Sequence, residues 1–173
     1  MFKDDQGFWN FFFTLFFALT FLVLGLLLLR YDLLPVSISL FDAFLLSLAT
    51  FRVTRLFVYD KITQFIRDWF LDKQLAQNEA GEYFIVREKP ASGPRRTLSE
   101  LLACPWCFGM WAALFVCFLY FLTPFAWFPI FVLAVSSIGT LFQLFANLVG
   151  WKAENYKRKV EGAETFDSAS LPR

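Results

Sequence analysis

The chain has 173 residues, of which 58% are hydrophobic, 18% are charged and 25 are phenylalanine. Soluble domains are about 45–50% apolar and about 25% charged, so this composition argues against a soluble globular fold and for a protein that uses lipid as part of its solvent. A net charge of +1 argues against nucleic-acid binding as a primary role, and the absence of histidine removes the commonest general base and metal ligand.

The first apolar segment extends from Phe8 to Leu29. Its length corresponds to a helix of about 33 Å, which is enough to cross the hydrocarbon core. A cleavable signal peptide is the alternative interpretation. Against it, the N-terminus carries Asp4 and Asp5 beside Lys3, the apolar run is long, and no A-x-A cleavage site follows. We expect a retained transmembrane helix over residues 8–29.

The second segment, Leu40 to Tyr59, is less apolar because it contains Asp42, Arg52 and Arg55. Taken alone, this pattern also fits a buried helix of a soluble domain. Its apolar neighbours favour a second transmembrane helix over residues 40–59.

Residues 60–71 differ from the preceding segment because their apolar residues recur at helical spacing and alternate with polar residues. This periodicity predicts an amphipathic helix that lies along the membrane surface. A helix that packs on a cytosolic partner domain is the alternative. The apolar face consists of Ile62, Phe65, Ile66, Trp69 and Phe70.

The next segment, residues 72–96, is polar and contains four glycine or proline residues, so we expect a loop. Within it, residues 82–88 form one short strand or stay extended. Thr97 and Glu100 have the spacing of a capping box and predict a short helix over residues 98–103. Pro105 suits the first turn of the following helix.

Two further transmembrane helices are expected over residues 105–122 and 125–149. Thr123 and Pro124 separate them, so the two helices must form a tight antiparallel hairpin. Residues 1–150 therefore form a four-span membrane domain. Residues 151–173 form a tail that is first basic and then, from Thr165, disordered. The predicted fold class is an all-α polytopic membrane protein with one cytoplasmic amphipathic helix.

The basic residues predict the orientation. With four spans, one Lys or Arg lies in the N-terminal tail, seven lie between Asp60 and Trp106, and five lie in the C-terminal tail. Only Arg30 lies on the opposite side, whereas Arg52 and Arg55 lie within the second span. By the positive-inside rule, both termini and the loop over residues 60–104 are cytoplasmic. The expected location is the cell (inner, cytoplasmic) membrane, which the chain would cross several times.

Cys104 and Cys107 form a C-P-W-C motif where the third helix enters the membrane. Two thiols at this spacing can bind a soft metal, exchange disulfides or serve only to shape a helix start. A closed zinc site needs four ligands, so a metal would require a dimer or a partner protein. The structural interpretation is favoured, and we expect no bound metal in a monomer and no cofactor.

Arg52 lies about 10 Å from the cytoplasmic end of its span. An arginine at this depth needs a partner, a cavity or a lipid headgroup. Gln143 lies at a similar depth in the fourth span, and Asn147 lies one turn nearer the cytosol. We predict that Arg52 donates a hydrogen bond to the fourth helix, with Gln143 as partner. Arg55 lies nearer the surface and is expected to reach lipid headgroups.

Two motifs carry a resemblance to a known family. The run A-T-F-R-V-T-R-L-F-V-Y-D-K-I-T from Ala49, and L-S-E-L-L-A-C-P-W-C-F-G-M-W from Leu98, resemble the domain-of-unknown-function 1360 family of small bacterial and phage membrane proteins. Some members are described as sporulation proteins, and no activity is established. The resemblance covers residues 41–122, and the loop over residues 72–96 is longer than the family pattern. The matching positions are Arg52, Arg55, Asp60, Cys104, Pro105, Cys107 and Gly109.

These observations favour a non-enzymatic membrane protein that acts as a structural, assembly or partner-binding component of a bacterial membrane complex. The expected partners are the bilayer, with anionic lipid at the cytoplasmic face, and a protein partner or a second copy of the chain. The alternative function is that of a thiol protein that uses Cys104 and Cys107 for redox chemistry or for an intersubunit metal site.

Overall fold

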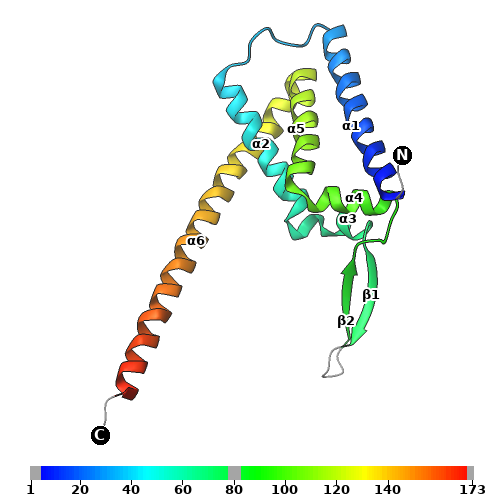
Figure 1. The fold of residues 1–173 in the computed structure, drawn as a ribbon. Coiled ribbons are helices and arrows are strands. Elements are labelled where there is room, and N and C mark those ends of the chain that lie inside the picture. The colour runs from blue at the N-terminus through cyan, green and yellow to red at the C-terminus, as the bar shows by residue number, and fades with distance from the viewer. Residues whose placement is uncertain (1–4, 78–82, 171–173) are drawn as a thin grey trace. The chain divides into compact units, whose positions relative to one another are not determined.

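The computed structural model describes residues 5–77 and 83–170, and its chain is mostly helical (Figure 1). It divides into two compact units, one up to Val135 and one from Ser136 onward. The elements in chain order are α1 (Asp5–Arg30), α2 (Leu40–Val58), the 3₁₀ helix η1 (Lys61–Thr63), α3 (Gln64–Asp68), β1 (Asp72–Gln77), β2 (Tyr83–Glu88), α4 (Pro94–Ala103), α5 (Pro105–Leu122), the 3₁₀ helix η2 (Pro124–Ala126) and α6 (Trp127–Ser170).

Three helical segments within the described ranges are long and apolar enough to cross a membrane: Gln6–Arg30, Pro105–Leu122 and Pro124–Val160. The first two agree with the predicted spans over residues 8–29 and 105–122. Helix α2 is not among the three, because it carries three charged residues, Asp42, Arg52 and Arg55. The predicted count of four spans is therefore not confirmed.

The core of the first unit lies between α2, α5 and the first two turns of α6. Ala49 is fully buried, and Leu45 and Ile130 are 3% and 4% exposed. Small residues bring α2 and α5 together, and a Cβ placed on Gly109 would lie 3.7 Å from the hydroxyl oxygen of Thr54. Close approach of two helix backbones through small side chains is typical of helix pairs in membranes.

The connection between α5 and α6 is the tight turn that Thr123 and Pro124 predict. The Thr123 side chain accepts a hydrogen bond from the backbone N–H of Phe125, and Pro124 takes the first position of η2. Proline fits this position because the first helical residue needs no backbone N–H donor.

Helix α6 is longer than the predicted fourth span, which ended at residue 149. It continues to Ser170, through the segment expected to be a disordered tail, and residues 171–173 lie outside the described part of the chain. The sequence after Trp151 contains strong helix formers, and the guanidinium of Arg158 pairs with Glu154 one turn earlier at 3.2 Å. Polarity alone did not distinguish a solvated helix from a disordered tail.

The segment predicted as one amphipathic helix over residues 60–71 is shorter and divided. It forms η1 followed by the five-residue helix α3. Asp60 is extended, and the Thr63 hydroxyl donates to the carbonyls of Leu56 and Asp60, which breaks a continuous helix at this point. A cytoplasmic amphipathic helix is therefore not confirmed.

The predicted loop over residues 72–96 contains an antiparallel hairpin, so the fold is not purely α-helical. Strand β2 agrees with the strand predicted at residues 82–88, whereas β1 was not predicted. The sequence of β1, D-K-Q-L-A-Q, has little intrinsic strand preference, and its pairing with Y-F-I-V-R-E supplies the stabilisation. The register pairs Leu75 with Ile85 and Gln77 with Tyr83.

Helix α4 begins at Pro94, four residues before the predicted start at Leu98. Gly93 precedes it with φ at 94°, a left-handed conformation that favours glycine. The expected capping box does not form, because Thr97 lies inside the helix and Glu100 pairs with Arg96 at 3.1 Å.

Candidate functional site

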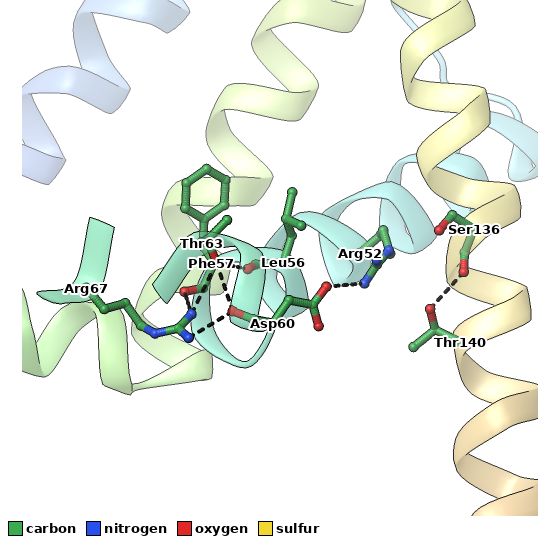
Figure 2. Close-up of polar contacts among 8 residues, drawn as sticks. All are labelled: Arg52, Leu56, Phe57, Asp60, Thr63, Arg67, Ser136 and Thr140. Carbon is green, nitrogen blue, oxygen red and sulfur yellow. Dashed lines mark hydrogen bonds and ion pairs between the residues drawn. The ribbon is translucent and has the colours of Figure 1, made fainter. Parts of the chain in front are cut away.

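The C-terminal end of α2 is closed by polar side chains from the segment that follows it (Figure 2). The guanidinium of Arg67 donates to the backbone carbonyls of Phe57 and Asp60 at 2.6 and 2.8 Å, and the Thr63 hydroxyl donates to the carbonyl of Leu56. The last carbonyls of a helix lack partners within the helix. A cation at this end also interacts favourably with the helix dipole. We call Thr63 and Arg67 the α2 clamp.

Arg52 and Asp60 lie beside this clamp and form an ion pair. The guanidinium Nη1 of Arg52 is 2.9 Å from the Asp60 carboxylate, and the side chains are 22% and 27% exposed (Figure 2). Both residues were predicted as polar candidates, but their pairing was not predicted. The turn after Tyr59 brings the carboxylate back along α2 toward Arg52.

The remaining polar candidates occupy two separate places. The guanidinium of Arg55 lies 5.2 Å from the centre of the Tyr59 ring, within cation–π range. In the second unit, the side-chain amide of Gln143 donates to Asn147 at 3.1 Å. Because Arg52 and Gln143 belong to different units, their hydrogen bond stays a prediction.

Cys104 and Cys107 lie at the start of α5 with their sulfur atoms 2.7 Å apart. Cys104 caps the helix, and its sulfur accepts a hydrogen bond from the backbone N–H of Cys107 at 3.3 Å. Hydrogen bonds from the Cys107 side chain, and then from backbone N–H groups, lower the pKa of the Cys104 thiol below its usual value of 9.0. A lower pKa makes the nucleophilic thiolate more abundant at neutral pH.

The cysteine pair lines a cavity of about 410 Å³ between α1, α4 and α5. Polar side chains form one wall, because Thr97 donates to Asn10 at 3.0 Å and accepts from Gln6 at 2.8 Å. This network joins α4 to the N-terminal turns of α1, so it positions the cavity wall that faces the thiols. Sequence reasoning missed it because α1 and α4 are far apart in the chain.

A metal centre on this pair would need ligands from elsewhere. Over residues 5–77 and 83–170, no cluster of three or more Cys, Asp or Glu residues has a geometry that could hold a metal ion. The intersubunit metal site stays an alternative that depends on a second chain.

Asp68 organises the base of the hairpin and was also missed. Its carboxylate pairs with Arg87 at 3.0 Å and with Lys73 at 3.2 Å. Partial burial raises the pKa of Asp68, but the hydrogen bonds and charges of Arg87 and Lys73 outweigh burial and lower it below 3.8. These contacts attach both strands to the end of α3.

Comparison with known proteins agrees with the resemblance of the two motifs. Residues 45–146 match the family described as "Protein of unknown function (DUF1360)". The chain is 35% identical to UPF0713 protein YngL of Bacillus subtilis over 107 residues, which are 61% of this chain and 78% of that protein. It is 37% identical to sporulation protein YjcA of the same organism over 75 residues, which are 42% of this chain and 61% of that protein. No solved structure matches the chain.

Proposed function

This chain belongs to the DUF1360 family of proteins of unknown function, and from this membership and the geometry above we propose that it is a non-enzymatic membrane protein that binds a protein partner in a bacterial membrane complex. The observation that carries the proposal is the exposed face of the β1–β2 hairpin. Leu75, Tyr83 and Ile85 share this face and are 77%, 73% and 54% exposed.

The exposed hairpin face has the chemistry of a protein-binding surface. A two-stranded hairpin alone is only marginally stable in water, so an apolar face of this kind gains from being covered. Lys73 and Arg87 lie at the base of the same face, next to Leu75 and Ile85. A partner with an apolar surface and an acidic rim is therefore complementary to it. In the first unit, the hairpin extends from the end of the bundle where α3 and α4 lie (Figure 1).

We further propose that α2 is a fourth span and that both termini are cytoplasmic. Its 19 residues rise about 28 Å, close to the thickness of the hydrocarbon core. Asp42 lies near the start of α2 and accepts from Tyr120 and Ser39. Arg52 lies deeper and pairs with Asp60, and Arg55 in the last turn lies over the Tyr59 ring. This distribution supports a span with polar ends, and the positive-inside rule supports its orientation.

The partner-binding proposal is tested by placing a photocrosslinking amino acid at Leu75 or at Gln74, which points to the opposite face of β1. We expect adducts to one defined protein from position 75 and few or none from position 74. The double variant Leu75→Ser, Ile85→Ser should lose this association while it keeps its expression and melting temperature. Equal adducts from both positions would contradict the proposal. Adducts between two copies of this chain would show that the hairpin face binds a second copy of the chain rather than a different protein.

A thiol function is the second candidate, because the two sulfur atoms are close and the pKa of Cys104 is lowered. The Cys104 thiolate would attack a substrate disulfide, form a mixed disulfide and release one substrate thiolate. Cys107 would then attack the Cys104 sulfur, form the Cys104–Cys107 disulfide and release the second substrate thiolate. Two electrons would thereby pass from the cysteine pair to the substrate. This function predicts that Cys107→Ser accumulates mixed disulfides on non-reducing gels and that Cys104→Ser does not.

A further inference from the structure

A second polar cavity, of about 420 Å³, lies between the turn that follows α2, η1, α3, the end of β2, and α4. Its volume falls within the roughly 300–1,000 Å³ of small-molecule sites. Four cationic side chains and one carboxylate line it: Lys61, Arg67, Arg87, Lys89 and Asp68. We call this space the basic cavity.

The cations of the basic cavity exceed its anions. Asp68 is the carboxylate in the lining, and its charge is shared between Arg87 and Lys73. Lys61 and Lys89 have no acidic partner among residues 6–77, 83 and 85–160, whose side chains the structure describes. Arg67 donates to neutral carbonyls and to the Thr63 hydroxyl, and it forms no ion pair with a carboxylate whose side chain the structure describes.

The surface beside the basic cavity is apolar and exposed. Ile62, Phe65 and Trp69 project from η1, α3 and the residue after α3, and they are 75%, 57% and 66% exposed. Aromatic and aliphatic side chains next to basic residues are typical of segments at the boundary between headgroups and acyl chains. An anion bound in the cavity would lie next to a surface suited to this boundary.

We propose that the basic cavity binds a phosphate group, and that its source is the headgroup of an anionic phospholipid. Arginine and lysine are the main phosphate ligands in proteins, and basic pockets at the cytoplasmic side of membrane helices bind anionic headgroups. A free phosphate ester has the same recognition chemistry, so the experiment separates the two sources. The lipid source rests on the proposed cytoplasmic orientation, whereas phosphate recognition itself does not.

The test uses the full chain purified in mild detergent. Native mass spectrometry measures retention of phosphatidylglycerol against phosphatidylcholine, and calorimetry measures binding of inorganic phosphate and glycerol 3-phosphate. The variant is Lys61→Gln, Lys89→Gln, which removes two exposed charges without breaking an ion pair among the described residues. Lys152→Gln, Lys159→Gln on α6 is the control, because it removes the same charge from exposed positions of the second unit.

We expect preferential retention of phosphatidylglycerol, reduced about 10-fold in the Lys61, Lys89 variant and unchanged in the control. Binding of the soluble phosphates with the same dependence on Lys61 and Lys89, but without lipid preference, would support phosphate recognition and overturn the lipid source. An equal loss in both variants would show general charge attraction and overturn the site. Absence of any dependence on Lys61 and Lys89 would also overturn it. All of these outcomes are independent of the crosslinking test of the hairpin face.

Discussion

Arg67 illustrates how a single side chain can close a helix end that the backbone leaves open. It serves carbonyls on both sides of the turn after α2, seven and ten residues earlier in the chain. In a polar segment, an arginine is usually expected to contact solvent or lipid. The sequence alone therefore does not indicate that Arg67 caps the end of α2. The carbonyls of Phe57 and Asp60 come within hydrogen-bonding distance of Arg67 only because the chain turns after Tyr59.

Removing the α2 clamp should destabilise the protein. We predict that Arg67→Met lowers the free energy of unfolding by about 2 kcal/mol, because it removes charge-assisted hydrogen bonds to partly buried carbonyls. Lys61→Met, at an exposed position without an acidic partner in the described ranges, should change it by less than about 0.5 kcal/mol. Denaturation in mild detergent measures both. Equal effects of the two substitutions would contradict the clamp.

The hydrogen bond from the Cys107 side chain should affect the pKa of the Cys104 thiol, and the pH dependence of Cys104 alkylation measures this effect. In a Cys117→Ser background, alkylation of Cys104 in the Cys107→Ser variant should show a midpoint below pH 9.0, because a hydroxyl still donates to the thiolate. In Cys107→Ala the midpoint should move upward, since the side-chain donor is lost and the backbone N–H donors persist. Rates of iodoacetamide labelling at several pH values give both midpoints. Identical midpoints in the two variants would refute the side-chain contribution.

Among the helices of the first unit, α2 and α5 make the most extensive contact with each other. Ala49 is fully buried, and Ala112 and Val116 are 4% and 6% exposed. Small side chains allow this approach, and any added volume must displace a neighbour because protein interiors are densely packed. The packing of α2 against α5 therefore depends on the size of the side chains at particular positions rather than on the hydrophobicity of the helices in general.

Adding volume at this contact should destabilise the helix pair. We predict that Ala49→Leu lowers the free energy of unfolding by about 1–3 kcal/mol, the usual cost of overpacking. Ala43→Leu, on an exposed position of the same helix, makes the same chemical change without a buried neighbour and should be nearly neutral. Thermal unfolding in detergent compares the two, and similar melting temperatures would argue against close packing of α2.

On the scale of the whole molecule, the orientation in the membrane depends on whether α2 spans it. Three spans with the N-terminus inside would place the seven basic residues between Asp60 and Trp106 outside the cell, against the positive-inside rule. Three spans with the N-terminus outside would place them inside and would place the segment before Leu40 inside as well. Four spans place them inside, together with both tails.

Reporter fusions distinguish three spans from four. We predict an external signal after Leu34 and cytoplasmic signals after Glu79 and after Arg173. With three spans and the same N-terminal orientation, the signals at Glu79 and Arg173 would both be external. External signals at both Glu79 and Arg173, or a cytoplasmic signal after Leu34 together with cytoplasmic signals at both later positions, would show that the segment from Leu40 to Tyr59 does not cross the bilayer.

The sequence alone determined the apolar helices and their connection. Length and hydropathy suffice for residues 8–29 and 105–122, because a helix satisfies its backbone hydrogen bonds within its own segment. Thr123 and Pro124 predicted the tight turn because both act through local backbone geometry. The family motifs likewise indicated Arg52, Asp60 and the cysteine pair as positions of interest.

Only the tertiary structure decided how those positions are paired. Strand β1 exists because β2 lies beside it, α4 begins at Pro94 rather than Leu98, and Thr97 turns to α1 instead of capping its own helix. The same holds for the clamp of Arg67 and for the cations gathered in the basic cavity. Each of these depends on contacts between residues separated along the chain, and such contacts leave no periodic or compositional signal in a single sequence.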